Sequence, residues 1–355
     1  DDIMRFLSVR DLMAGQPWFD KVQTRAAPPE GLTLHWSRML DALIAGLIGI
    51  GALALPLDQA EGLALRLWPT LLFAGLVLLT AIGGRRCLGP WPAAVAVLSL
   101  LCWPVFLGSY FGPVRIDHHN VQILLGTAVI VTLVVSGNPW ALGAAAGAPA
   151  AISLAVGLEL LPVLALSGAI LALRAVRDPE GAGRQLLAYS GCALAGALVL
   201  FAVETSPSHW PVPACDVLAP PFLAIMGAST VASAAYLAIA QRLPSRGAKL
   251  AALLALGGAA LAVTSGLWAP CMSGPYGDLP AEAQRMISER IIEAQPAWAL
   301  WSGHQEALVS LVAPPLGAAL AATGLLAVRL RAGHTDPGEV RVVGTLLIFA
   351  WVGLL

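Results

Sequence analysis

The stretch RLWPTLLFAGLVLLTAIG, residues 66–83, is almost entirely apolar, and the arginine pair Arg85–Arg86 follows one residue later. An α-helix needs about 20 predominantly apolar residues to cross the roughly 30 Å hydrocarbon core of a bilayer. Arginine and lysine collect on the cytoplasmic side of such helices. The stretch therefore predicts a membrane-spanning helix that ends at the inner face.

The rest of the chain repeats this pattern, with 58% hydrophobic and 12% charged residues overall. A soluble domain has about 25% charged residues. We therefore expect an all-α fold, a polytopic transmembrane helical bundle with functional outer loops. The net charge of −1 argues against a nucleic-acid partner. The other apolar segments fall near residues 39–57, 91–108, 120–136, 139–157, 158–176, 186–203, 221–241, 248–268, 307–330 and 340–355.

Basic residues divide the connections between these segments into two sets. Connections that carry clusters of arginine and lysine are expected to be cytoplasmic. Counting crossings from residue 66 onwards then puts 109–119, 204–220 and 269–306 on the outer side. The clusters are Arg85 and Arg86; Arg174, Arg177 and Arg184; Arg242, Arg246 and Lys249; and Arg329, Arg331 and Arg341.

The same counting predicts two regions. Residues 1–38 form a first outer loop with an amphipathic helix, and residues 39–355 form the multi-helix transmembrane domain. Segment 39–57 would break the alternation if it crossed, so we expect an interfacial or re-entrant helix there. The abrupt polar start and the apolar last residues predict that an N-terminal membrane helix and any C-terminal soluble domain lie outside these residues.

Two of the five cysteines, Cys215 and Cys271, fall in the predicted outer loops. An oxidising periplasm would allow a disulfide between them. Two free thiols in separate loops fit the sequence equally well.

The stretch RIDHHNVQ, residues 115–122, places an aspartate and two histidines between apolar segments. In an extended loop Asp117 and His119 point the same way, so they could share one divalent cation. In the alternative interpretation, Asp117 is only the N-cap of a helix that starts at Asn120. The predicted outer face also carries Asp1, Asp2, Asp11, Asp20, His35, His118, Glu289 and Glu293.

Three other stretches accompany this motif in a definite order. DDIMR (residues 1–5) opens the first outer loop, and PPEGLTLHW (28–36) ends it. IIEAQPAW (291–298) precedes a late apolar segment. In this order, with the Asp-His-His motif between them, the chain resembles the catalytic subunit of oligosaccharyltransferase in its archaeal and bacterial forms, within the C-type membrane glycosyltransferases.

The resemblance implies roles for individual residues. Asp117 and His119 match the motif that binds Mg²⁺ or Mn²⁺, and His35 matches a histidine close to the metal. Glu293 matches a loop glutamate that reaches the same site near the acceptor. The first-motif aspartate is Asp2 or Asp1, although these stand three and four residues before Arg5, where the family has about six.

The implied activity is glycosyl transfer with inversion from a polyprenyl-linked phosphate or pyrophosphate sugar donor. The acceptor would be a protein, lipid or polysaccharide, on the outer face of a bacterial or archaeal plasma membrane. Asp2, Asp117 and Glu293 would be catalytic. A short amphipathic helix expected around 280–293 carries the substrate-binding candidates Arg285 and Arg290, which join His35 and His118.

Two alternatives stay open at this point. The family's soluble domain with its W-W-D motif is absent from these residues, so the enzyme could instead transfer a single sugar to a lipid or polysaccharide. A transporter would place ionisable residues near the bilayer midplane and show internal repeats. Here the acidic residues gather in the loops instead.

Overall fold

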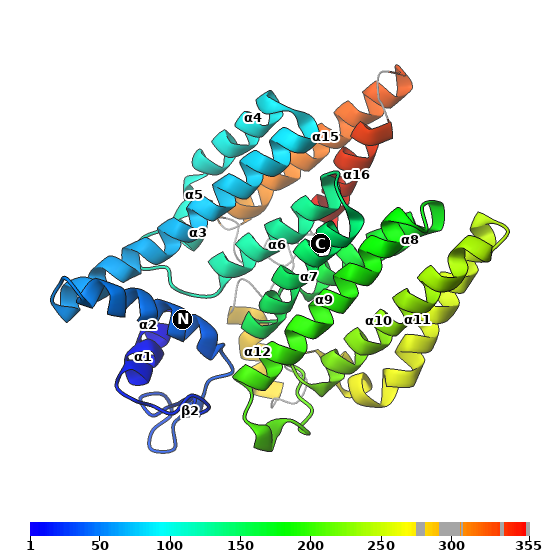
Figure 1. The fold of residues 1–355 in the computed structure, drawn as a ribbon. Coiled ribbons are helices and arrows are strands. Elements are labelled where there is room, and N and C mark those ends of the chain that lie inside the picture. The colour runs from blue at the N-terminus through cyan, green and yellow to red at the C-terminus, as the bar shows by residue number, and fades with distance from the viewer. Residues whose placement is uncertain (275–280, 291–305, 307, 334–336, 353–355) are drawn as a thin grey trace.

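The computed structural model describes residues 1–274, 281–290, 306, 308–333 and 337–352. Helices dominate this part of the chain, and its strands are two short segments that pair in antiparallel fashion, β1 (Val22–Gln23) and β2 (Leu32–Thr33). Figure 1 shows the arrangement. The helices are α1 (Asp2–Met13), α2 (Arg38–Ala52), α3 (Leu57–Leu88), α4 (Pro90–Leu101), α5 (Pro104–Phe106), η1 (Leu107–Phe111), α6 (His119–Val134), α7 (Pro139–Val156), α8 (Leu161–Arg177), α9 (Gly181–Glu204), η2 (Pro207–His209), α10 (Pro220–Ile239), η3 (Ala240–Arg242), α11 (Arg246–Trp268), η4 (Ala269–Ser273), α12 (Ala281–Arg290), η6 (Leu308–Val312), α15 (Ala313–Arg331) and α16 (Pro337–Val352).

Within the described residues, six helices are long and apolar enough to cross a membrane. A seventh span results if the bent pair formed by α4 and the segment 104–111 is counted as one; the two parts meet at an angle of 59°. Pro104 lies at that bend, and a proline supplies no backbone N–H to a continuous helix. The predicted all-α, polytopic bundle is thus confirmed at this level.

The segment 39–57 is not one long helix. α2 has 15 residues and is not among the helices that could span a membrane. A tight turn joins it to α3, and a Cβ atom added at Gly51 would lie 3.2 Å from the Cβ atom of Ala60. α2, the start of α3 and α1 share one small apolar core that includes Val9, Ile44 and Ala64. With 15 residues, α2 is shorter than the roughly 20 residues that a spanning helix needs, and its interfacial or re-entrant placement stays a prediction.

The main apolar core lies between α6, α7, α8 and α9, where Val129, Ala146, Leu171 and Ala197 are almost fully buried. α7 and α9 approach each other closely because small residues line their contact. A Cβ atom added at Gly147 of α7 would lie 2.6 Å from the backbone oxygen of Tyr189 in α9. Close contact through small residues is a common way for membrane helices to associate.

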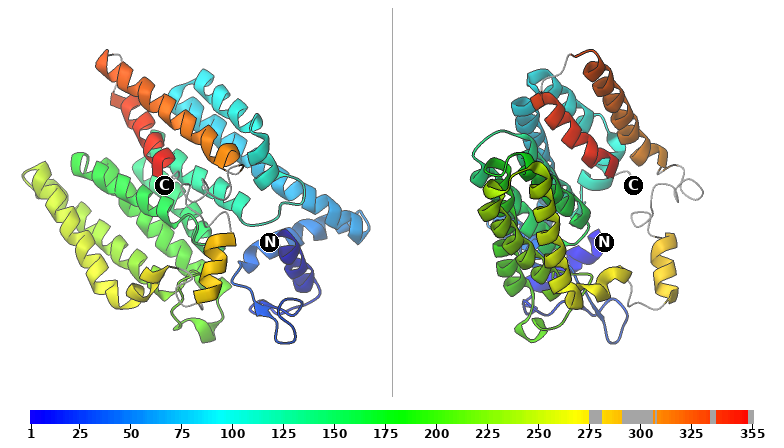
Figure 2. Two further views of the ribbon diagram at one scale, coloured as in Figure 1. Left: turned by 180° about the vertical axis from the view of Figure 1, so that it is seen from behind. Right: turned by 90° about the vertical axis from the view of Figure 1, so that its right-hand side faces the viewer.

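The predicted outer loops meet at one end of the bundle. The Trp18 indole donates to the Val203 carbonyl over 2.7 Å, which joins the first loop to the end of α9. Cys215 and Cys271 form a disulfide, which joins the 204–220 loop to the loop after α11. Both views in Figure 2 place α12 at this same end of the bundle. The pairing that the sequence left open is therefore formed.

The α7–α9 contact gives a testable prediction. Gly147→Ala should destabilise the protein by about 1–3 kcal/mol, because the added methyl group overpacks the contact with α9. Gly258→Ala in α11 is the matched control, since nothing lies within 4 Å of its added Cβ atom. The control should be neutral or slightly stabilising, because alanine favours a helix over glycine. Thermal unfolding in detergent measures both, and equal melting temperatures would contradict the described packing.

Candidate functional site

The loop before α6 is held by α1. The carboxylate of Asp2 accepts hydrogen bonds from the backbone N–H groups of Ile116 (2.8 Å) and Asp117 (3.0 Å). Its other oxygen forms an ion pair with Arg115 at 2.8 Å. Within this loop Val114 has a positive φ of 73°, and its backbone N–H donates to the Leu65 carbonyl of α3. The first and second acidic motifs are therefore in direct contact.

Asp117 is the centre of the site. Its Oδ2 lies 2.6 Å from His119 Nδ1, and its Oδ1 lies 2.7 Å from His118 Nδ1. One ligand atom from each of these three residues lies within 4.8 Å of the others. No other group of three or more His, Cys, Asp or Glu residues in the described part of the chain meets this condition.

The N-cap interpretation of Asp117 is not supported by the hydrogen bonds. α6 begins at His119, and no side chain caps its N-terminus. The Asp117 carboxylate accepts from the backbone N–H of the adjacent His118 but from none farther along the helix. An N-cap side chain normally accepts from the second or third helical residue. Asp117 is oriented towards the two imidazoles instead.

His118 bridges two carboxylates. Its Nδ1 faces Asp117 and its Nε2 lies 2.8 Å from Glu159 Oε1, in the connection between α7 and α8. Burial alone would lower the pKa of His118, but hydrogen bonds to Asp117 and Glu159 outweigh it and raise this pKa to about 9. His118 is therefore protonated near neutral pH and engages both carboxylates as a donor.

The positive charge of His118 affects its partners in turn. Burial would raise the pKa of Asp117, but the hydrogen bonds from His118 and His119 outweigh burial and hold that pKa well below its usual range. The pKa of Glu159 is also lowered, with burial again opposed by the hydrogen bond from His118. Both carboxylates are thus ionised at any physiological pH.

Two buried polar side chains, Gln122 and Ser153, are hydrogen-bonded in series to Glu159. Gln122 donates to Glu159 Oε2 over 2.9 Å and accepts from the Ser153 hydroxyl over 2.6 Å. Gln122 and Ser153 are both almost fully buried in the bundle. The site is thereby connected to α6 and α7 through side chains that have little freedom to move.

His35 lies at the edge of the same site. Desolvation lowers the pKa of His35, and the nearby charges of Asp216, His118 and Glu159 act on the same imidazole. Asp216 is the neighbour of the disulfide-bonded Cys215. His35 is therefore close enough to Asp216, His118 and Glu159 to be influenced by their charges.

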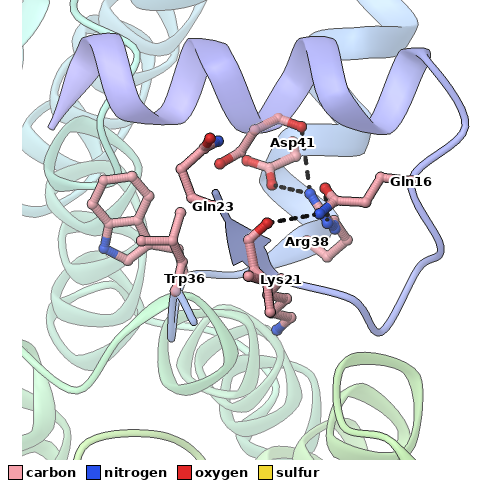
Figure 3. A pocket seen from close by; sticks show the side chains of 9 residues that line it. Gln16, Lys21, Gln23, Trp36, Arg38 and Asp41 are labelled. Atoms are coloured by element: carbon pink, nitrogen blue, oxygen red, sulfur yellow. Dashed lines mark hydrogen bonds and ion pairs between the residues drawn. The ribbon is translucent and has the colours of Figure 1, made fainter. Parts of the chain in front are cut away.

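A cluster of buried charges anchors the first loop behind the site, as Figure 3 shows for Arg38 and its neighbours. Arg5 of α1 and Arg38 of α2 both form ion pairs with Asp41, at 3.0 and 3.2 Å. Arg5 is fully buried, and its guanidinium also lies 4.8 Å from the centre of the Trp36 ring. Breaking a buried pair on one side typically costs about 3–5 kcal/mol.

Glu204 fixes the start of α2 from the far end of α9. It accepts hydrogen bonds from the Ser37 hydroxyl and from the backbone N–H groups of Arg38 and Met39, at 2.7–2.8 Å. Lys21 completes the arrangement with an ion pair at 3.3 Å. A carboxylate at a helix N-terminus satisfies unpaired backbone donors and interacts favourably with the helix dipole.

The remaining candidates lie apart from this centre or outside the described residues. The exposed Asp1 has no side-chain cap bond to α1, and Asp2 rather than Asp1 contacts the Asp117 loop. The short helix expected in this region is present as α12, residues 281–290. Arg285 is an exposed residue of this helix. Arg290 is the last residue of that helix, but its side chain and all of Glu293 lie outside the described residues.

Sequence reasoning missed two residues of the site, Glu159 and Gln122, and one residue that anchors the first loop, Glu204. Each is an isolated polar residue in or beside an apolar segment. Ionisable residues in or beside membrane helices are rare, and each is therefore expected to have a functional or structural role. That rule could have singled out Glu159 and Glu204, but it does not predict which residues they contact.

The different environments of the two first-loop aspartates give a prediction. Asp2→Ala should lower the free energy of unfolding by about 1–3 kcal/mol, because two backbone donors and Arg115 lose their acceptor. Asp1→Ala should leave it almost unchanged. Thermal unfolding in detergent measures the difference, and protease sensitivity of the 113–117 loop provides a local readout. Equal behaviour of the two variants would show that Asp2 does not hold this loop.

Comparisons of the chain with protein-family models, with curated proteins and with solved structures found no match. The resemblance to the oligosaccharyltransferase catalytic subunit therefore rests on the order of the motifs. Independently of that resemblance, the structure brings two of these motifs together and places His35 of a third within electrostatic reach.

Proposed function

We propose that this protein is a metal-dependent membrane glycosyltransferase that uses a polyprenyl-linked phosphate or pyrophosphate sugar donor. The observation that carries the proposal is the Asp117–His119 pair, held by Asp2 at the end of a bundle of apolar helices. A lipid-linked donor can keep its chain in the bilayer and present its head group at such an end.

The residues present fit a divalent cation. Two ligands that are neighbours around an ion with bonds of about 2.1 Å lie roughly 3 Å apart. Asp117 Oδ2 and His119 Nδ1 are 2.6 Å apart, so a small separation would admit an ion between them. Carboxylate oxygen suits Mg²⁺ and Mn²⁺, and the imidazole ligand makes Mn²⁺ the better match of the two.

Asp117 and His119 would hold the cation, with Asp2 of α1, which contacts the Asp117 loop, as the additional carboxylate. When bound there, the cation supplies Lewis-acid stabilisation to the oxygens of the leaving phosphate. His118 is occupied by Asp117 and Glu159, so its role is to position Asp117 and to add positive charge beside the donor phosphate. His35 lies where it could contact the donor or acceptor.

The acceptor must be oriented by a carboxylate on the opposite side of the donor. Glu293 is the proposed residue, from its place in the sequence before the late apolar segment. Arg285 and Arg290 on α12 are proposed to contact donor phosphate. The outer, periplasmic location of the site follows in this proposal from the arginine-rich connections at the other end of the bundle.

The test is transfer of sugar from a polyprenyl-phosphate or pyrophosphate donor by the purified chain in detergent, with and without Mn²⁺. Asp117→Ala and the isosteric Asp117→Asn should lower metal-dependent transfer by more than about 100-fold, because loss of a partner of a bound ligand alone costs 10–100-fold. Binding of Mn²⁺, followed by electron paramagnetic resonance, should weaken in parallel. Peptide, lipid and polysaccharide acceptors assayed side by side identify the acceptor class.

Glu30→Gln is the matched control, because Glu30 is an exposed carboxylate in the first loop, away from Asp117 in the chain. It should retain full transfer and full Mn²⁺ binding. A metal-dependent mechanism at this residue would be refuted if Asp117→Asn were as active as the wild type. It would also be refuted if removal of the metal left sugar transfer by the wild type unchanged. Size-exclusion profiles and melting temperatures check that the variants are folded.

A further inference from the structure

A large cavity opens at the other end of the bundle. Its volume is about 1290 Å³, and it lies between the ends of α6 and α8, the starts of α7, α9 and α11, and α16. It is separated from the Asp117 site by the length of α6, whose 16 residues correspond to about 24 Å. The cavity is therefore a different site from the one proposed to hold the donor phosphate.

Four arginines line this cavity: Arg174, Arg177, Arg246 and Arg341. Arg174 donates to the Leu133 carbonyl and to the Thr345 hydroxyl, both at 2.6 Å, and both acceptors are neutral. Arg341 has a long contact of 3.5 Å with the Ser136 hydroxyl. The positive charges of Arg174 and Arg341 also repel each other.

These four charges are not neutralised by the protein in the part of the chain that the structure describes. No carboxylate there lies within 4.0 Å of any of the four guanidinium groups. The cavity does contain Asp178, but its carboxylate accepts from the backbone N–H groups of Gly181 and Ala182 at the start of α9. A cavity with this charge favours an anion.

The walls of the cavity are apolar and open. Leu173 of α8 is 59% exposed, Ile348 of α16 is 45% exposed and Leu250 of α11 is 38% exposed. In a bilayer such side chains contact lipid chains. Because arginines and apolar walls occur together here, the expected ligand has an anionic head and a hydrocarbon tail.

We propose that this cavity binds an anionic phospholipid of the adjacent leaflet, with its phosphate among the four arginines and one acyl chain along Leu173 and Ile348. Arginine matches phosphate geometry through paired N–H donors. Basic pockets between membrane helices are a known mode of anionic headgroup recognition. A phosphate there would also relieve the repulsion between Arg174 and Arg341 and hold α16 against α8.

The test is native mass spectrometry of the full chain in detergent with defined phosphatidylglycerol or phosphatidylcholine. The wild type should retain phosphatidylglycerol with at least tenfold higher affinity than phosphatidylcholine. The double variant Arg177→Gln/Arg341→Gln should bind phosphatidylglycerol about 25-fold more weakly, about fivefold for each arginine near the surface. Arg177→Lys/Arg341→Lys keeps both charges and should recover most of the binding.

Arg242→Gln/Arg331→Gln is the matched control, because it removes two exposed arginines from the same end that do not line the cavity. It should bind as the wild type does. Equal affinity of the wild type for the two lipids, or equal loss in both glutamine double variants, would overturn the proposal. Displacement of the phospholipid by an equal concentration of inorganic phosphate would show a phosphate site without lipid recognition and would also overturn it.

Discussion

The free-energy cost of placing an ionised side chain in hydrocarbon determines where the charged residues of this protein lie. That cost is about 3 kcal/mol for each charge at the centre of a membrane helix, by insertion scales. The apolar helices therefore carry few charges, and their ionisable groups gather at the two ends of the bundle. One end collects Asp2, Asp117, His118 and Glu159, and the other collects Arg174, Arg177, Arg246 and Arg341. Both proposed sites are consequences of this separation.

At the acidic end, the charged side chains form hydrogen-bonded pairs with one another. His118 is engaged by Asp117 and Glu159, and both carboxylates are thereby kept ionised. His119 uses only its Nδ1 towards Asp117, and its Nε2 has no hydrogen bond among the described residues. Asp117 Oδ2 and His119 Nδ1, the two facing atoms, are the pair between which the proposed cation would lie.

Hydropathy predicted where the helices are, because bilayer thickness fixes their length and composition. It did not predict that α3 starts at Leu57, because the first turns of this helix contain Asp58 and Glu61 and are too polar to be recognised as part of a membrane span. Motif order predicted Asp117 and His119 to lie beside Asp2 or Asp1, and in the structure Asp2 is the one in contact with Asp117. Glu159 and Glu204 could not be predicted, because their partners lie 41 and about 167 positions away and no local pattern encodes such contacts.

The buried arginines explain why an acidic residue and an arginine occur close together at the start of α1. Asp2 and Arg5 are three residues apart in a helix, so they lie on neighbouring positions of one face. Arg5 is buried against Asp41 and Trp36, which fixes the position and rotation of α1. Asp2 is then presented to the backbone of Ile116 and Asp117 by a rigid element. The charge cluster in α1 and α2 therefore acts on the candidate metal site through Asp2, without touching the site itself.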